Sequence, residues 1–169
     1  GVEQHGGSLR VDPLLHRIVR ELHPHPPLEL GVPPPHRVVG GRLQLRARRA
    51  SAEERRQYGG RPWLSALLTT YRSFGQRYGL FTMRAKLPKG RGAWPAFWLL
   101  PNPHPAVWPP EIDILEYVPI ANRGDQSDRY HIGWVVPDGR GGHRGSGHWV
   151  APRLGDLSRD VHAWSFLWT

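Results

Sequence analysis

Residues 108–117 read WPPEIDILEY, and the spacing of their three acids restricts how this stretch can form a strand. In a β-strand, Glu111 and Asp113 point to one face, and the isoleucines that follow them point to the other. Strict alternation would turn Glu116 into the core, where a lone carboxylate is costly. One extra residue, a β-bulge at 114–115, brings all three acids to one face. The stretch therefore predicts a bulged strand with an acidic face.

Three carboxylates on one face repel each other, so fold stability gives no reason for the cluster. A glycosidase needs one ionised and one protonated carboxyl group across the scissile bond, and burial and like charge separate such pKa values. The outer two Cα atoms would lie roughly 13 Å apart at about 3.3 Å per residue. This spacing does not choose between a retaining pair of carboxyl groups at about 5–5.5 Å and an inverting pair at about 6.5–9.5 Å. The alternatives are an acidic strand that faces solvent and a divalent-metal site made by the same acids.

Short strands with turn signals between them surround this stretch. Apolar runs or polar–apolar alternation predict strands over 42–48, 64–71, 78–87, 94–100, 111–118, 129–136 and 161–168. Polar, Pro-rich or Gly-rich composition predicts loops over 50–62, 101–110 and 137–147. The pattern predicts an all-β fold, an antiparallel β-sandwich.

Residues 1–37 differ from the rest in composition. Two turns of helix are predicted over 14–21, and the Pro-rich runs at 23–27 and 33–35 favour extended or irregular chain. We predict a Pro-rich, irregular N-terminal segment over 1–37 and one domain over 38–169.

Composition limits the function classes. The 169 residues contain no cysteine, which excludes disulfides and thiolate metal sites. The net charge of +9 favours an anionic partner, or else reflects a solvated basic surface, since the arginines are scattered. A nucleic-acid binder would leave the clustered acids unexplained, because they repel phosphate. The eight tryptophans are typical of a sugar-binding groove or of a Trp-rich core.

Three stretches together resemble one known family. They are YGLFTMRAKLPKG at 78–90, GAWPAFWLLP at 92–101 and EIDILE at 111–116. Their order and spacing resemble glycoside hydrolase family 16, in its bacterial laminarinase-like (endo-1,3-β-glucanase) branch, over about 40–169. The resemblance implies a concanavalin-like β-jelly roll with a groove across its concave sheet. Because the family's domain continues beyond the position of Thr169, we expect 38–169 to be a partial catalytic domain, incomplete at the C-terminus.

The resemblance also implies roles for the acids. Glu111 would be the nucleophile, and Glu116 the general acid that then serves as base. Asp113, between them, would hold the charge and proton state of the nucleophile in order. Substrate-binding positions implied by the same resemblance are Arg84, Trp94, Trp98, Trp108 and His131. The alternatives are core packing for the tryptophans and a structural role for the histidine; Thr82 departs from the Glu of many members.

The implied activity is endo-cleavage of β-1,3 or mixed β-1,3/1,4 glucans with net retention. An agarase or galactanase of the same family is the first alternative, and a non-catalytic carbohydrate-binding protein on the same fold is the second. We expect a polysaccharide partner, no nucleic acid, no membrane, and a monomer if the domain is complete. No cofactor or catalytic metal is expected, with a structural calcium left open. Because polysaccharides lie outside cells, we expect the full-length protein to be secreted or periplasmic.

Overall fold

A computed structural model describes residues 36–70, 74–101, 108–122 and 124–169. The chain divides into two compact units, one up to Gly75 and the other over Gln76–Thr169. The helix predicted over 14–21 and the Pro-rich runs up to 35 lie outside the described residues. Among the residues that are described, no helix is long and apolar enough to span a membrane.

The first unit contains two short hairpin-like pairs. Strand β1 (His36–Val39) pairs with β2 (Arg42–Leu45), and β3 (Arg48–Arg49) pairs with β4 (Trp63–Leu64), both antiparallel. The strand predicted over 42–48 is thus interrupted after Leu45. The strand predicted over 64–71 is wrong for residues 65–70, which carry no strand. That apolar run lacks the polar–apolar alternation of a half-buried strand.

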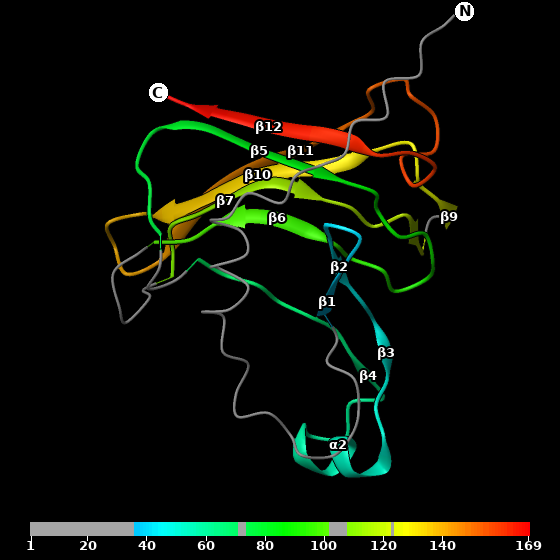
Figure 1. The fold of residues 1–169 in the computed structure, drawn as a ribbon. Coiled ribbons are helices and arrows are strands. Elements are labelled where there is room, and N and C mark those ends of the chain that lie inside the picture. The colour runs from blue at the N-terminus through cyan, green and yellow to red at the C-terminus, as the bar shows by residue number, and fades with distance from the viewer. Residues whose placement is uncertain (1–35, 71–73, 102–107, 123) are drawn as a thin grey trace, which may run out of the picture. The chain divides into compact units, whose positions relative to one another are not determined.

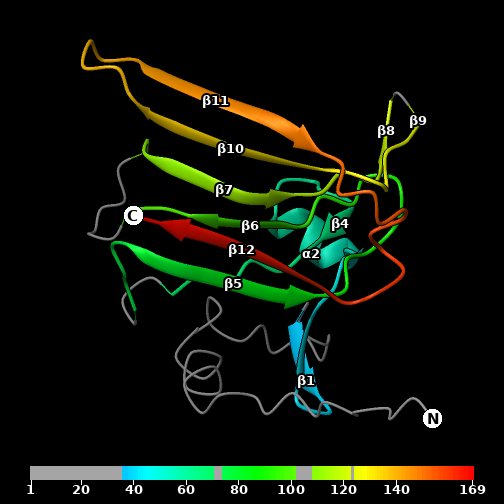
Figure 2. The ribbon, with the colours of Figure 1, turned by 90° about the horizontal axis from the view of Figure 1, so that it is seen from above.

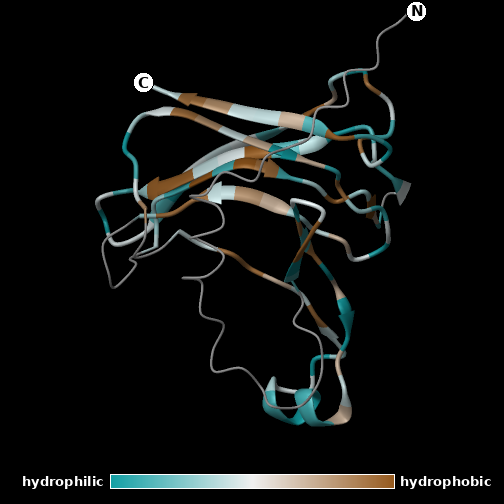
Figure 3. Ribbon diagram, in the orientation of Figure 1, coloured by the Kyte–Doolittle hydropathy of each residue, from teal (hydrophilic) through white to brown (hydrophobic). Residues whose placement is uncertain are grey.

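A short helix replaces part of the loop predicted over 50–62. Helix α2 (Ala52–Gln57) begins with a capping box, in which the Ser51 side chain accepts from the Glu54 amide and the Glu54 carboxylate accepts from the Ser51 amide. Glu54 is 1% exposed. It pairs with Arg48 at 2.6 Å, and this hydrogen bond is the largest cause that lowers the pKa of Glu54 to about 2. Figure 3 shows the helix mostly in the colours of hydrophilic residues.

The second unit is built from two antiparallel sheets. The larger has the order β11-β10-β7-β6, and its strands are β6 (Ala96–Leu99), β7 (Glu111–Glu116), β10 (Tyr130–Pro137) and β11 (His143–Val150). The smaller pairs β5 (Gly79–Ala85) with β12 (His162–Trp168), and Figures 1 and 2 show it layered against the larger sheet. The remaining pair is the hairpin β8 (Ile120–Ala121) and β9 (Gly124–Asp125). The predicted all-β antiparallel sandwich is confirmed.

The core of this unit lies between the two sheets. Its buried side chains are Leu87, Leu115, Tyr117, Leu157 and Trp164, and partly buried Met83, Ala85, Phe97 and Tyr130 pack against them. These residues come from both sheets, from the chain that follows β5 and β7, and from the loop before β12. One face of the four-stranded sheet is therefore occupied by core packing, and its strand alternation sends the other set of side chains away from this core.

Strand β11 corrects the loop predicted over 137–147. It begins at His143, so only residues 138–142 connect it to β10. Gly145 and Gly147 lie inside the strand, paired with Val135 and Gly133. A Cβ on Gly147 would lie 2.6 Å from the His131 ring, so the glycine marks a close approach rather than a loop.

Candidate active site

The bulge in β7 brings the three acids to one face. On β10, His131 pairs with Glu116 and Gly133 pairs with Asp113. One residue of β10, Ile132, therefore lies opposite two residues of β7, and β6 shows a similar register shift. Paired residues share a face of a sheet. The predicted bulge at 114–115 is confirmed, and all three acids face away from the core that holds Leu115.

Glu111 is held at one end of this acidic face. The indole Nε1 of Trp108 donates a hydrogen bond to Glu111 Oε2. The ring of Trp108 also meets His143 of β11 edge-to-face, with ring centroids 5.0 Å apart. Trp108 is 52% exposed, so about half of its surface is open to a ligand. A flat, half-exposed indole beside a carboxylate is suited to bind a sugar ring.

Asp113 lies between the two glutamates, and its pKa is raised to near neutrality. Burial is the largest cause that raises the pKa of Asp113 to about 7, and the charges of Glu111 and Glu116 raise it further. A hydrogen bond with Glu111 acts in the same direction, and the charge of His131 opposes it. A protonated Asp113 donates a hydrogen bond to Glu111, so one proton reduces the repulsion between neighbouring carboxylates.

Glu116 is held at the other end by two ring nitrogens. Trp94 Nε1 donates to Glu116 Oε1 at 3.1 Å, and His131 Nδ1 lies 2.9 Å from Glu116 Oε2. The His131 ring in turn meets Trp149 of β11 edge-to-face, with centroids 5.5 Å apart. The two glutamates therefore lie in different hydrogen-bonding surroundings, as two carboxyl groups with separate tasks require.

The structure gathers most, but not all, of the predicted binding residues. Trp94, Trp108 and His131 contact the acids, and Trp98 pairs with Asp113 and shares its face. Arg84 is not brought to the acids. It is an exposed residue of β5 in the other sheet, where the alternation that turns Met83 and Ala85 toward the core turns Arg84 outward.

Sequence reasoning missed the contribution of β11 to this face. Trp149 lies beside His131, and His143 lies beside Trp108. Both come from the stretch HRGSGHWV at 143–150. This stretch has no polar–apolar alternation, and its glycines are typical of a loop, so no local signal indicated the strand.

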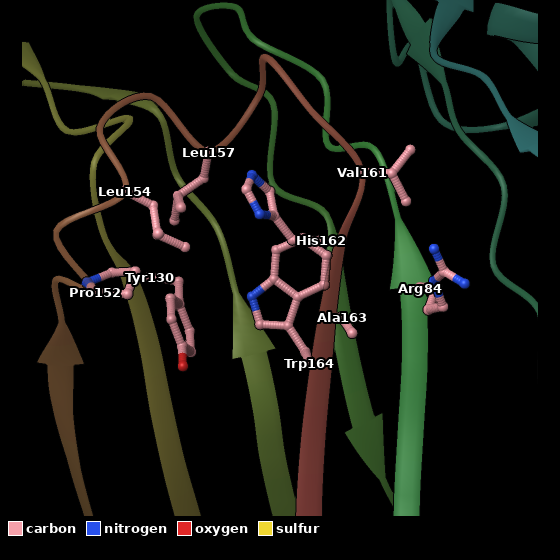
Figure 4. Close-up of a pocket in the computed structure, with 9 residues that line it drawn as sticks. All are labelled: Arg84, Tyr130, Pro152, Leu154, Leu157, Val161, His162, Ala163 and Trp164. Atoms are coloured by element: carbon pink, nitrogen blue, oxygen red, sulfur yellow. The ribbon is translucent and has the colours of Figure 1, made fainter. Parts of the chain in front are cut away.

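A separate hollow lies at one end of the sandwich. Figure 4 shows its lining, with Tyr130 and Trp164 on the two sheets and Leu157 in the loop before β12. His162 also lines it, and its buried Nε2 has no hydrogen-bond partner in the structure. The hollow contains none of the three acids. Among the described residues, no group of three or more histidines and acids is arranged to hold a metal ion.

Comparison with known sequences gives the same family over both units. The model of glycosyl hydrolases family 16 matches residues 39–169. The endo-1,3-1,4-beta-glycanase EglC of Rhizobium meliloti is 48% identical over 82 residues, which cover 48% of this chain and 17% of that protein. The beta-glucanase of Rhodothermus marinus is 36% identical over 138 residues, which cover 79% of this chain and 44% of that protein.

Comparison with solved structures agrees. The laminarinase catalytic domain of Thermotoga maritima superposes with a TM-score of 0.63 at 34% identity, covering 80% of this chain and 53% of that one. The chain thus spans about half of that domain and less of the two curated relatives. Fold, acidic strand and sequence agree, and the chain belongs to family 16 of the glycosyl hydrolases.

Proposed function

We propose that this chain carries the catalytic centre of an endo-acting β-glucanase that cleaves β-1,3 or mixed β-1,3/1,4 linkages with retention. The observation that carries the proposal is the bulged strand β7, which places Glu111, Asp113 and Glu116 on one face. The names of the relatives, a beta-glucanase, an endo-1,3-1,4-beta-glycanase and a laminarinase, support the substrate class.

The reaction would proceed by double displacement. A Glu111 carboxylate oxygen attacks the anomeric carbon while protonated Glu116 gives its proton to the departing glycosidic oxygen. The sugar is then bound to Glu111 as an ester. Glu116, now ionised, takes a proton from water, and the resulting hydroxide oxygen attacks the same carbon and releases Glu111 as a carboxylate. The second inversion restores the original configuration, and Glu116 regains its proton.

The protonation state of Asp113 would change with the charge on Glu111 through this cycle. Before attack, its proton supports the ionised nucleophile through their shared hydrogen bond. Once Glu111 becomes an ester, its charge and its hydrogen bond no longer raise the pKa of Asp113, and the charge that Glu116 gains in the same step raises it less. Asp113 then ionises more readily, and its charge would favour the cationic transition state of the second step.

The hydrogen bonds to the glutamates support this division of work. Glu111 accepts from the Trp108 indole, which suits a carboxylate that stays ionised. Glu116 lies against His131, whose ring can accept or donate as the proton on Glu116 leaves and returns.

One observation favours a second substrate class. The net charge of +9 suits an anionic polymer, so a sulfated galactan is the alternative substrate on the same site. As part of the same proposal, the full-length protein acts outside the cytoplasm, in the secreted or periplasmic space where polysaccharides occur.

Reducing-sugar release from laminarin, lichenan and agarose tests the proposal. We expect release from laminarin or lichenan, and its loss in Glu116→Ala and Glu111→Gln. Release from agarose alone would favour the galactanase alternative. Binding of laminarin without hydrolysis by the parental chain would favour the non-catalytic alternative. The anomer of the first product, observed by proton NMR during hydrolysis, separates retention from inversion.

A further inference from the structure

Two glycines lie beneath the His131 ring on the acidic face. Gly133 of β10 pairs with Gly147 of β11 on one side and with Asp113 of β7 on the other. A Cβ on Gly133 would lie 3.3 Å from His131 Cε1, and a Cβ on Gly147 would lie 2.6 Å from both Cε1 and Nε2. The imidazole therefore occupies the space that side chains at these two positions would fill.

Two further contacts hold the His131 ring in place. Trp149 meets it edge-to-face at 5.5 Å, with 60° between the two planes. Toward β7, Nδ1 reaches Glu116 Oε2 at 2.9 Å. Packing thus fixes the ring on the side of β10 and β11, and a hydrogen bond fixes it on the side of β7. A small displacement of the ring would lengthen the bond to Glu116, whose strength falls with distance and angle.

We propose that Gly133 is a positioning residue for the reaction. Its missing side chain lets His131 lie flat along β10, where Nδ1 reaches Glu116 and fixes the orientation of that carboxyl group. This inference rests on the proposed role of Glu116 as the general acid and base. A methyl group at position 133 would press on the ring first, because Asp113 Oδ2 lies at an ordinary contact distance of 3.6 Å from the same point.

Gly133 offers a cleaner test than Gly147. A Cβ on Gly147 would also lie 2.7 Å from the Ile132 carbonyl oxygen, so a substitution there disturbs the β10–β11 ladder whatever residue occupies position 131. At Gly133 the nearest backbone atom is the Ser146 carbonyl oxygen at 3.4 Å, and the φ angle lies outside the left-handed region. Alanine also restricts the unfolded chain more than glycine does, so Gly133→Ala should not lower folding stability.

The experiment compares four forms of the full 169-residue chain: parental, Gly133→Ala, His131→Ala and the double variant. The readouts are kcat/KM on the best hydrolysed glucan, the thermal midpoint, and the ring nitrogen signals of His131 in long-range ¹H–¹⁵N spectra, identified by their loss in His131→Ala. We expect Gly133→Ala to shift the His131 signals, to lower kcat/KM about tenfold through misplacement, and to leave the midpoint unchanged or higher. In the His131→Ala background, Gly133→Ala should cause no further loss, because no ring remains to displace.

Three results would overturn the proposal: unchanged His131 signals in Gly133→Ala, an equal loss of kcat/KM in both backgrounds, or a double variant that fails to fold. Failure of the proposed function would look different. The parental chain would then hydrolyse no glucan. Gly133→Ala would still shift the His131 signals, which would support the packing of the ring against Gly133.

Discussion

Asp113→Asn tests how the acids share a proton, because asparagine keeps the shape of the side chain but cannot ionise. The pKa of Asp113 is about 7 in the folded chain, compared with 3.8 for an aspartate in the unfolded chain. Between these pH values the folded state keeps a proton that the unfolded state has lost. The contribution of Asp113 to stability is therefore greatest below about pH 4, falls as the pH rises toward 7, and is level above it.

The size of this fall follows from the same two values. One pKa unit corresponds to about 1.4 kcal/mol, so the upper limit is about 4 kcal/mol. Asp113 is only partly buried and its neighbours share the proton, so we expect about 1–2 kcal/mol after solvent screening. Asp113→Asn should thus be more stable than the parental chain by about this amount at pH 8, and similar to it at pH 4.

Urea unfolding at pH 4, 6 and 8 measures the difference. Asp138→Asn is the matched control, because this exposed turn residue accepts hydrogen bonds from Arg140 and Gly142 that an asparagine oxygen also accepts. It should leave the pH dependence of the parental chain unchanged. An Asp113→Asn variant that keeps the parental pH dependence, or that is destabilised equally at all three pH values, would show that Asp113 does not hold an additional proton in the folded chain.

The remaining predictions concern the contacts around the acids and the first unit. Trp108→Phe keeps a ring but removes the donor to Glu111; we expect kcat to fall about tenfold, as loss of about 1.5 kcal/mol implies, and an unchanged kcat would contradict that role. Trp149→Ala should weaken glucan binding about tenfold, measured by calorimetry in the Glu111→Gln background, because about half of this indole is exposed; unaltered affinity would remove Trp149 from the binding surface. Ser51→Ala should lower the free energy of unfolding by about 1 kcal/mol in urea, since it removes the N-cap of α2. An equal loss in Ser51→Thr, which keeps a capping hydroxyl, would argue against the cap as the cause.

The acidic strand could be predicted because its sequence breaks the period of two by one residue. Only a bulge keeps Glu116 out of the core while Leu115 stays in it, and the registers of both neighbouring strands show that bulge. Burial cost and strand geometry were therefore sufficient at this point, without knowledge of the partners.

Strand β11 could not be predicted in the same way. Glycine is disfavoured in strands, and Gly145 and Gly147 made the stretch resemble a loop. Glycine is needed at position 147 because of tertiary contacts: the His131 ring and the Ile132 carbonyl oxygen leave no room for a side chain. A local pattern cannot contain a contact from a neighbouring strand, and Trp149 was missed with the strand that carries it.

Two further differences have local causes. Helix α2 has only six residues, too few for a helical period, although the spacing of Ser51 and Glu54 was a capping signal. Alternation shows that the side chains of Arg84 and Met83 point to different faces of β5. Which of these faces meets the core depends on the packing of β5 against the larger sheet. The resemblance placed Arg84 in the groove, and the sheet turns it away.

Chemical trapping of the covalent intermediate would identify the nucleophile. A 2-deoxy-2-fluoro β-glucosyl or β-laminaribiosyl fluoride slows both displacement steps but keeps a good leaving group, so the ester on the nucleophile accumulates. We predict that intact mass rises by one glycosyl group and that peptide mapping places the group on Glu111, with no label in Glu111→Gln. A label on another residue, or steady hydrolysis of glucan with inversion and no label, would contradict the assignment of Glu111 as nucleophile.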